Sequence, residues 1–235
     1  MNTNFTKEEK GENVLLFLHG WGCDGNIFRA LSSQLNCTNY LIDFWGFGQS
    51  DTPQTAWCVA DYAAQLKNFC DQHGLSRVSI IAHSFGARVG VVFASKYPDM
   101  VEKLLMVGGA GLRRASIKRF IKVARYKLAK FLSKFGIFCK NLPKGSADYR
   151  VLNGTMKGTF VKVVNQNLAR YARRICCPTL LVWGKDDHQT PLWMGKKYNK
   201  LIANSSLVVL NGGHFVFLEK PTQFALIAKS FLGLN

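Results

Sequence analysis

Residues 78–86 read VSIIAHSFG, an apolar strand-like run that ends in a serine. Residues 85–97 continue with a mainly apolar pattern that suits a covered helix. Ser84 is therefore expected on a sharp turn between a buried strand and a helix. Serine hydrolases raise their nucleophile on such a turn, in the pattern G-x-S-x-G, and here Ala82 replaces the first glycine. The alternative is a serine that merely caps the helix.

Most of the chain alternates short apolar runs with helical patterns. The expected strands are Val14–Gly20, Tyr40–Phe44, Val78–His83, Lys103–Gly108, Thr179–Gly184 and Ser206–Leu210. The expected helices are Gly25–Leu35, Val59–His73, Phe85–Tyr97, Leu192–Ile202 and Thr222–Leu232. The runs are largely uncharged, as in strands that are covered on both faces. The sequence therefore predicts an α/β fold, with a mostly parallel sheet and helices on both of its faces.

The net charge of +17 is concentrated in one segment. Residues 112–174 hold 17 Lys and Arg against one acidic residue, and the remainder is nearly neutral. Within this segment, residues 117–135 show apolar positions at three- and four-residue steps with basic residues between them, which predicts an amphipathic cationic helix. A second helix is expected within residues 158–173. We interpret 112–174 as a small basic helical cap, inserted between two parts of one core domain, 1–111 and 175–235.

Composition excludes several classes of protein. With 235 residues, 48% hydrophobic and 12% aromatic, the chain can bury a substantial core. It has no run of about 18 apolar residues, so no membrane-spanning helix is expected. The polar residues 1–13 lack the apolar core of a secretion signal, which favours a cytoplasmic protein. Seven cysteines without a C-x-x-C pair indicate free thiols, and we expect neither a metal nor a cofactor.

A glycine-rich loop follows the first parallel strand. It reads His19-Gly20-Trp21-Gly22. Acyl transfer needs preorganised donors for the developing oxyanion. The main-chain N–H groups of Trp21 and Phe85 are the candidates, and a purely structural loop is the alternative. We expect His19 to be a structural hydrogen-bonding residue rather than a base.

An acid and a histidine follow two late strands. Asp186 and Asp187 come directly after Thr179–Gly184, and His214 follows Ser206–Leu210. The order serine, acid, histidine, each after its own strand, is that of a hydrolase triad. In such a triad the histidine accepts the serine proton and the carboxylate orients the imidazole.

Together these motifs make the chain resemble the α/β-hydrolase superfamily, in its group of small serine esterases. Asp43-Phe44-Trp45-Gly46-Phe47-Gly48-Gln49-Ser50-Asp51 is similar to the family's D-x-x-G-x-G-x-S-D turn, with Trp45 where proline is common. The histidine loop and the final helix also match, and His-Gly-Trp-Gly is similar to that of the pimeloyl-acyl-carrier-protein methyl ester esterases and related carboxylesterases. The family's leading antiparallel strands are absent here or reduced to a stub before Val14.

The resemblance implies the roles of individual residues. Gly184, Asp187 and Pro191 match the pattern G-x-x-D-x-x-x-P, so Asp187 rather than Asp186 is the implied acid. The implied nucleophile is Ser84, and the implied general base is His214. A serine at the nucleophile position disfavours the aspartate-dependent dehalogenases and epoxide hydrolases.

The expected activity is hydrolysis of a carboxylic ester or thioester of a small to medium acyl substrate. Lactonase, carbon–carbon hydrolase and lyase activities use similar constellations and stay open, as does a non-catalytic binding protein on the same frame. The cationic face of the cap is either solvated or recognises an acidic carrier protein or an anionic membrane surface. Nucleic acid is not expected, because no binding module accompanies the charge. The oligomeric state is left open.

Overall fold

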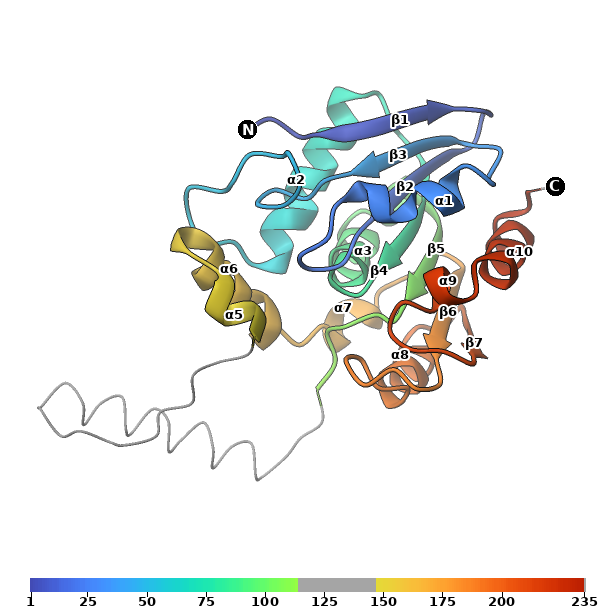
Figure 1. The fold of residues 1–235 in the computed structure, drawn as a ribbon. Helices are drawn as coiled ribbons and strands as arrows, with labels where there is room; N and C mark the ends of the chain where they lie inside the picture. Colours follow the sequence, from blue (N-terminus) through green and yellow to red (C-terminus); the bar gives the residue numbers. More distant parts are fainter. Residues whose placement is uncertain (114–146, 235) are drawn as a thin grey trace, which may run out of the picture. The chain divides into compact units, whose positions relative to one another are not determined.

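The computed structural model describes residues 1–113 and 147–234. Its centre is a seven-stranded sheet with the order β1-β3-β2-β4-β5-β6-β7 (Figure 1). The strands are β1 Phe5–Glu9, β2 Val14–Leu18, β3 Thr38–Ile42, β4 Val78–His83, β5 Val101–Val107, β6 Thr179–Gly184 and β7 Ser205–Leu210. β1 pairs with β3 antiparallel, and every other neighbouring pair is parallel. The predicted mostly parallel sheet is confirmed.

The six expected strands are all present, with ends that differ by a few residues. β2 ends at Leu18, so His19 and Gly20 belong to the loop that follows it. β1 is the one strand that the strand prediction omits. At the sheet edge it has one apolar residue, Phe5, followed by the polar run Thr6–Glu9, so it gives no apolar signal like that of the covered strands.

Helices connect the strands. They are α1 Arg29–Ser32, α2 Val59–Gln72, α3 Phe85–Lys96, α5 Ala147–Val151, α6 Gly154–Asn165, α7 Ala169–Ala172, α8 Trp193–Leu201, α9 Val216–Glu219 and α10 Pro221–Leu232, with short 3-10 turns η1 Gly25–Phe28 and η2 Pro98–Met100. The helix expected over 25–35 is shorter, formed by η1 and α1. The helix expected within 158–173 is two helices, α6 and α7, and Asn167 Oδ1 between them accepts a hydrogen bond from Ala169 N at 3.2 Å.

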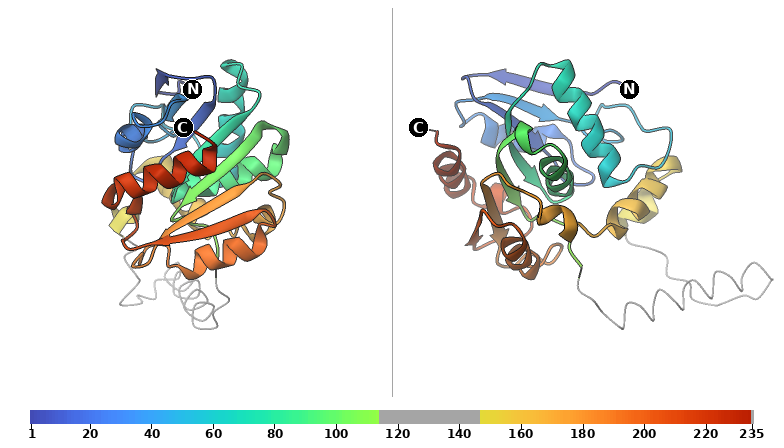
Figure 2. Two further views of the ribbon diagram at one scale, coloured as in Figure 1. Left: turned by 90° about the vertical axis from the view of Figure 1, so that its right-hand side faces the viewer. Right: turned by 180° about the vertical axis from the view of Figure 1, so that it is seen from behind.

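The sheet separates two apolar cores. Leu16 and Leu18 of β2 belong to one core, and Leu15 and Phe17 belong to the other, because successive strand residues point to opposite faces. Helices α2, α3 and α8 cover the first face, whereas α1 and α10 cover the second (Figure 2). Burial on both faces explains why these strands read as continuous apolar runs.

The structure divides the chain into two compact units, residues 1–112 with 154–235, and residues 113–153. The larger unit thus includes residues 154–174, which the sequence analysis assigns to the cap. The expected amphipathic basic helix of residues 117–135 lies outside the described residues. Within the described part of the chain, no helix combines the length and apolarity required to cross a membrane.

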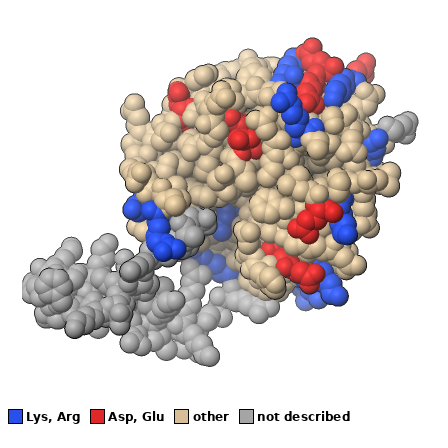
Figure 3. All heavy atoms as spheres, in the orientation of Figure 1, with Lys and Arg blue, Asp and Glu red and all other residues tan. Residues whose placement is uncertain are grey.

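Charges of both signs lie together on the frame. Figure 3 shows basic and acidic side chains intermixed where β1 ends. There Lys7 pairs with Glu9, and Lys10 Nζ lies 3.4 Å from Glu8 Oε2. Exposed pairs of this kind add about 0–1 kcal/mol to stability. They agree with a frame that is nearly neutral outside residues 112–174.

Candidate active site

Ser84 occupies a strained turn between β4 and α3. Its φ and ψ are 49° and −101°, and it is the one non-glycine residue with a positive φ in the described ranges 1–113 and 147–234. Such a conformation costs about 1–3 kcal/mol and persists where the surroundings enforce it. Here Ser84 N donates to Val107 O at 3.0 Å, and Gly86 N donates to His19 O at 2.9 Å. The turn is therefore held by the loop after β2 and by β5.

Gly86 is required by close packing behind this turn. A Cβ atom at this position would lie 2.1 Å from the main-chain oxygen of Leu18. Ala82 is fully buried, so a methyl group fits where the usual pattern has glycine. The departure from G-x-S-x-G thus leaves the turn intact.

Asp187 and His214 form a buried hydrogen-bonded pair. His214 Nδ1 lies 2.7 Å from Asp187 Oδ2. The other carboxylate oxygen, Oδ1, accepts from the main-chain N–H groups of Gln189 at 2.9 Å and Thr190 at 2.8 Å. Burial acts to raise the pKa of Asp187, but the hydrogen bonds from His214 and Thr190 outweigh it and hold the pKa below its usual value. The carboxylate therefore stays ionised beside the imidazole.

Asp186 does not take this place. It is exposed, whereas the side chain of Asp187 is fully buried against His214. The main-chain N–H of Asp186 donates to Gly212 O at 3.0 Å, and Lys185 N donates to Leu210 O at 2.8 Å. These bonds tie the loop after β6 to the loop after β7 and turn Asp187 inward.

The histidine loop is anchored on both sides of His214. Gly213 N donates to Glu219 Oε2 at 2.7 Å. On the other side, His83 Nε2 lies 3.0 Å from His214 O. Since a carbonyl oxygen accepts, His83 carries a proton on Nε2. Burial lowers the pKa of His83 to about 3, so its ring is neutral.

The strand ends bring these groups together. Ser84 N bonds to Val107 O, and the next residue, Gly108, faces the pair: a Cβ atom there would lie 3.1 Å from both Asp187 Oδ2 and His214 Nδ1. The imidazole centroids of His83 and His214 are 4.6 Å apart. Ser84, Asp187 and His214 thus follow β4, β6 and β7 at one edge of the sheet.

The proposed oxyanion donors lie beside Ser84. A Cβ atom on Gly20 would be 3.6 Å from Ser84 Cβ, so the loop that carries Trp21 touches the turn. Phe85 is the first residue of α3, a position whose N–H has no partner inside its own helix. These two N–H groups stand on the two segments that converge on Ser84.

His19 is structural in its contacts, as expected. Its Nδ1 lies 2.7 Å from Gly20 O, and its Nε2 accepts from Phe44 N at 2.9 Å. Burial lowers the pKa of His19 to about 4. Both ring nitrogens are occupied by main-chain atoms, so His19 orients the loop and is unsuited to proton transfer.

Asp43 organises the glycine-rich turn that follows β3. Its Oδ1 accepts from Gly25 N at 2.8 Å, and its Oδ2 accepts from Gln49 N at 2.9 Å. A Cβ atom on Gly48, whose φ is 54°, would lie 2.1 Å from Asp43 Oδ2. The turn needs glycine at this position, which accounts for this part of the motif.

Three aromatic rings surround Trp21. Its ring centroid lies 4.8 Å from Phe47, 5.2 Å from Phe85 and 5.1 Å from Phe160. Phe160 comes from α6, far away in the sequence. The sequence analysis does not name Phe47 or Phe160 as candidate site residues, because an aromatic residue in a loop or a helix gives no local signal of the ring that it contacts.

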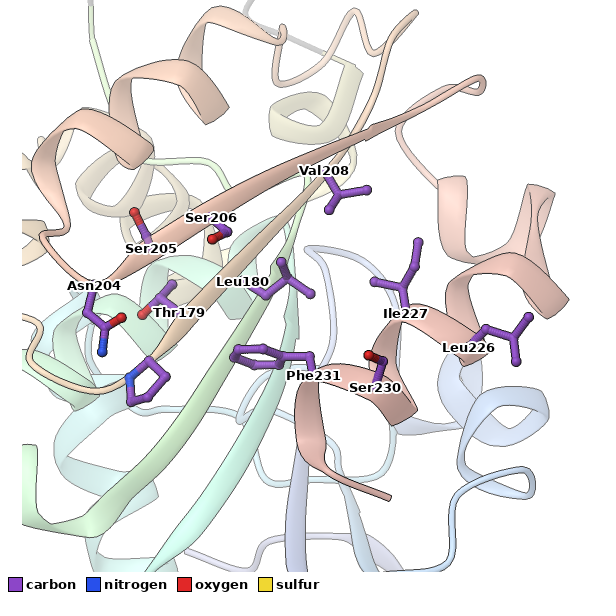
Figure 4. A pocket seen from close by; sticks show the side chains of 11 residues that line it. Thr179, Leu180, Asn204, Ser205, Ser206, Val208, Leu226, Ile227, Ser230 and Phe231 are labelled. Carbon is purple, nitrogen blue, oxygen red and sulfur yellow. The ribbon is translucent and has the colours of Figure 1, made fainter. Parts of the chain in front are cut away.

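A separate groove lies between β7 and α10. It has a volume of about 500 Å³, and Figure 4 shows Leu180, Val208, Ile227 and Phe231 around it. Other lining residues come from the starts of β6 and β7, whereas Asp187 and His214 follow the ends of the same strands. The groove is therefore remote from the candidate active site.

Comparison with known proteins identifies the family of this chain. The model of the alpha/beta hydrolase family matches residues 15–225. The chain is 26% identical to a putative 2-succinyl-6-hydroxy-2,4-cyclohexadiene-1-carboxylate synthase of Bacillus subtilis, over 95% of this chain and 93% of that protein. It is 26% identical to lipase 3 of a Moraxella species, over 98% of this chain and 79% of the lipase.

A solved structure has the same fold. The esterase of Exiguobacterium antarcticum superposes with a TM-score of 0.77 at 20% identity, covering 98% of this chain and 95% of the esterase. The family match spans six of the seven strands of the sheet and the loops between them. This chain therefore belongs to the alpha/beta hydrolase family.

Proposed function

We propose that this hydrolase cleaves a carboxylic ester or thioester of a small to medium acyl group through Ser84, His214 and Asp187. The observation that carries the proposal is the buried 2.7 Å bond between His214 and Asp187, at the strand edge where Ser84 stands on its strained turn. A base oriented by a carboxylate beside a raised serine suits nucleophilic acyl transfer.

In the first step the Ser84 oxygen attacks the acyl carbon, and His214 accepts the serine proton. The developing oxyanion is stabilised by the N–H groups of Trp21 and Phe85. The tetrahedral intermediate collapses, and His214 gives the proton to the leaving alkoxide or thiolate. Water then attacks the acyl-enzyme with His214 again as base, which releases the acid and restores Ser84.

Asp187 keeps its negative charge throughout. Its carboxylate holds the His214 tautomer with the proton on Nδ1 and stabilises the imidazolium. The lowered pKa of Asp187 supports this role, because a carboxyl group that stayed protonated would not stabilise the cation.

The aromatic rings around Trp21 favour an apolar acyl group. Phe47 and Phe160 are half-buried, and their rings contact that of Trp21, whose N–H group is a proposed oxyanion donor. Burying an acyl chain against them contributes about 0.8 kcal/mol for each methylene group. We therefore infer a preference set by chain length rather than by charge on the acyl group.

The test is hydrolysis of p-nitrophenyl esters from acetate to decanoate by wild type, Ser84→Ala and Ser79→Ala. Ser79 lies on the same strand, away from the turn, and serves as the matched control. We expect an optimum at one chain length, a loss of about 10³–10⁶-fold in Ser84→Ala, and near wild-type rates in Ser79→Ala. Turnover retained in Ser84→Ala would refute the assignment.

A second candidate is carbon–carbon hydrolysis or lyase chemistry on the same residues. The Bacillus subtilis relative is named a putative synthase rather than an esterase, which favours this second candidate. A fluorophosphonate probe reports whether Ser84 is activated, whatever the natural substrate, and ester turnover then separates the two candidates. Labelling of Ser84 together with absent ester turnover points to this second chemistry. Absent labelling points to a binding protein on a hydrolase frame.

A further inference from the structure

Thr190 lies at the centre of the contacts that hold Asp187. It follows Asp187 by three residues and is almost completely buried. Its hydroxyl oxygen lies 2.7 Å from Asp187 Oδ2, 2.8 Å from Gly108 O and 3.2 Å from His214 Nδ1. One hydroxyl thus contacts the acid, the base and the strand end that lies between them and Ser84.

Counting donors and acceptors shows which group receives the hydrogen bond from the Thr190 hydroxyl. Asp187 Oδ2 and Gly108 O both accept, and the hydroxyl has one proton to donate. The charged carboxylate is the stronger acceptor, and it is the closer of the two. Thr190 N also donates to Asp187 Oδ1 at 2.8 Å. A single residue therefore holds both oxygens of the carboxylate, one through its main chain and one through its side chain.

We propose that Thr190 is a positioning residue of this hydrolase, whose hydroxyl holds Asp187 Oδ2 in place against His214. The proposal rests on the proposed function, in which His214 must be neutral to accept the Ser84 proton. Thr190 touches neither substrate nor Ser84 in this scheme and acts through Asp187.

Removing the hydroxyl acts on the pair in two ways. Without its donated hydrogen bond, Asp187 Oδ2 is less firmly held and attracts the imidazolium more strongly. The hydroxyl oxygen also lies 3.2 Å from His214 Nδ1, where it favours the imidazolium, so its loss acts in the opposite direction. The acid limb of the activity profile therefore moves by the difference between the two effects. The titration belongs to the pair, so it is measured as an apparent value.

Other titratable groups near the pair do not account for this effect. From the end of β4, His83 faces His214, and burial keeps its pKa near 3. From α9, Glu219 accepts from Gly213 N, one residue before His214. Asp186 and His188 are exposed on the loop of Asp187 itself. All of these groups are unchanged in a Thr190 variant.

The test compares Thr190→Val and Thr190→Ser with wild type. Valine matches the shape of threonine and keeps the main-chain donor to Oδ1, whereas serine keeps the hydroxyl. NMR titration of the His214 imidazole gives its apparent pKa without a substrate, and the pH dependence of fluorophosphonate labelling gives the activity of Ser84. Thr179→Val removes another buried hydroxyl, which bonds Cys177 O, and is the matched control.

We expect labelling of Ser84 to be about tenfold slower in Thr190→Val, because the carboxylate that orients His214 is less firmly held, and we expect the acid limb and the His214 titration to shift. Thr190→Ser should restore the wild-type behaviour, and Thr179→Val should leave it unchanged. Unchanged labelling in Thr190→Val overturns the proposal. If wild type is not labelled while the NMR shift is present, the proposed function fails and the positioning by Thr190 stands.

Discussion

His83 Nε2 donates a hydrogen bond to the main-chain oxygen of His214 across 3.0 Å. The residue directly before Ser84 thus holds the residue that we propose as its base, although 131 positions separate the two histidines. The rings also lie against each other, with centroids 4.6 Å apart. This contact links the turn after β4 to the loop after β7, and it involves neither the Ser84 hydroxyl nor the imidazole nitrogens of His214.

Replacing His83 with leucine should loosen the histidine loop. The His214 carbonyl loses its donor inside a buried site, so we expect a loss of about 1–3 kcal/mol in unfolding free energy and about tenfold in kcat. Glutamine carries an N–H donor near the former Nε2 position, so His83→Gln should recover most of both. Urea unfolding and ester hydrolysis measure the two effects. Equal behaviour of the two variants would mean that this hydrogen bond does not hold the loop.

The buried histidines should make the protein unstable in acid. Burial lowers the pKa of His19 to about 4 and that of His83 to about 3, from an ordinary value of 6.5. Below pH 6.5 these two histidines bind protons in the unfolded chain but not in the folded chain, so the unfolding free energy falls as pH falls. Each histidine contributes a slope of about 1.4 kcal/mol per pH unit until its folded pKa is reached. The lowered pKa of Asp187 acts in the same direction, but only below about pH 4.

Urea unfolding at several values between pH 7 and pH 4.5 measures this slope. His83→Gln removes one titrating group, so its slope should be smaller than that of wild type by about 1.4 kcal/mol per pH unit. His188 is exposed, and His188→Asn is the matched control with the wild-type slope. Parallel curves for all three proteins would contradict the inference that His83 is held neutral.

Two glycines of α3 should differ in their response to alanine. A Cβ atom on Gly86 would meet Leu18 O at 2.1 Å and His19 O at 2.8 Å, and both are main-chain atoms that cannot move aside. We expect Gly86→Ala to lower the unfolding free energy by about 3 kcal/mol or more, with loss of labelling at Ser84. A Cβ atom on Gly90 would meet the end of the Leu104 side chain at 3.3 Å.

Gly90→Ala is therefore the control on the same helix. The gain in helix propensity, about 1 kcal/mol, offsets the small shift of the leucine, so its melting temperature should stay close to that of wild type. Thermal unfolding of both variants tests the pair. Similar losses in both would show that the helix as a whole, rather than its contact with the loop after β2, is sensitive to added volume.

Phe160 should limit the length of the acyl group. Its ring lies 5.1 Å from that of Trp21, so Phe160→Ala opens space beside the proposed oxyanion donors. The preferred p-nitrophenyl ester should become longer, with kcat/KM gaining about fourfold for each methylene group that newly finds a buried place. Val161 is on the same helix and exposed, and Val161→Ala should keep the wild-type preference. An unchanged optimum in Phe160→Ala would place the acyl group elsewhere.

The mostly parallel sheet could be predicted, and the three catalytic residues could be proposed, because their signals are local. A covered parallel strand needs about six consecutive apolar residues, and the polar residue that follows it lies at the edge where such strands end together. Ser84, Asp187 and His214 each follow a strand in this way. Their shared edge follows from the parallel arrangement before any contact is known.

Other features had no local signal. Thr190 stands in an ordinary loop position, and its bond to Gly108 O joins residues 82 apart in the chain. Phe160 could belong to any helix, and its contact with Trp21 depends on how α6 packs. The break between α6 and α7 depends partly on the bond from Leu168 N to Gly111 O, which periodicity within residues 158–173 does not contain.

By itself, therefore, the sequence determined the parallel α/β sheet, the turn that carries Ser84 and the chain order of serine, acid and histidine, because each depends on a few neighbouring residues. The tertiary structure alone decided what holds the Asp187 carboxylate against His214 and which rings face Trp21. These depend on side chains that reach across strands and loops. Such contacts form only after the whole sheet has assembled.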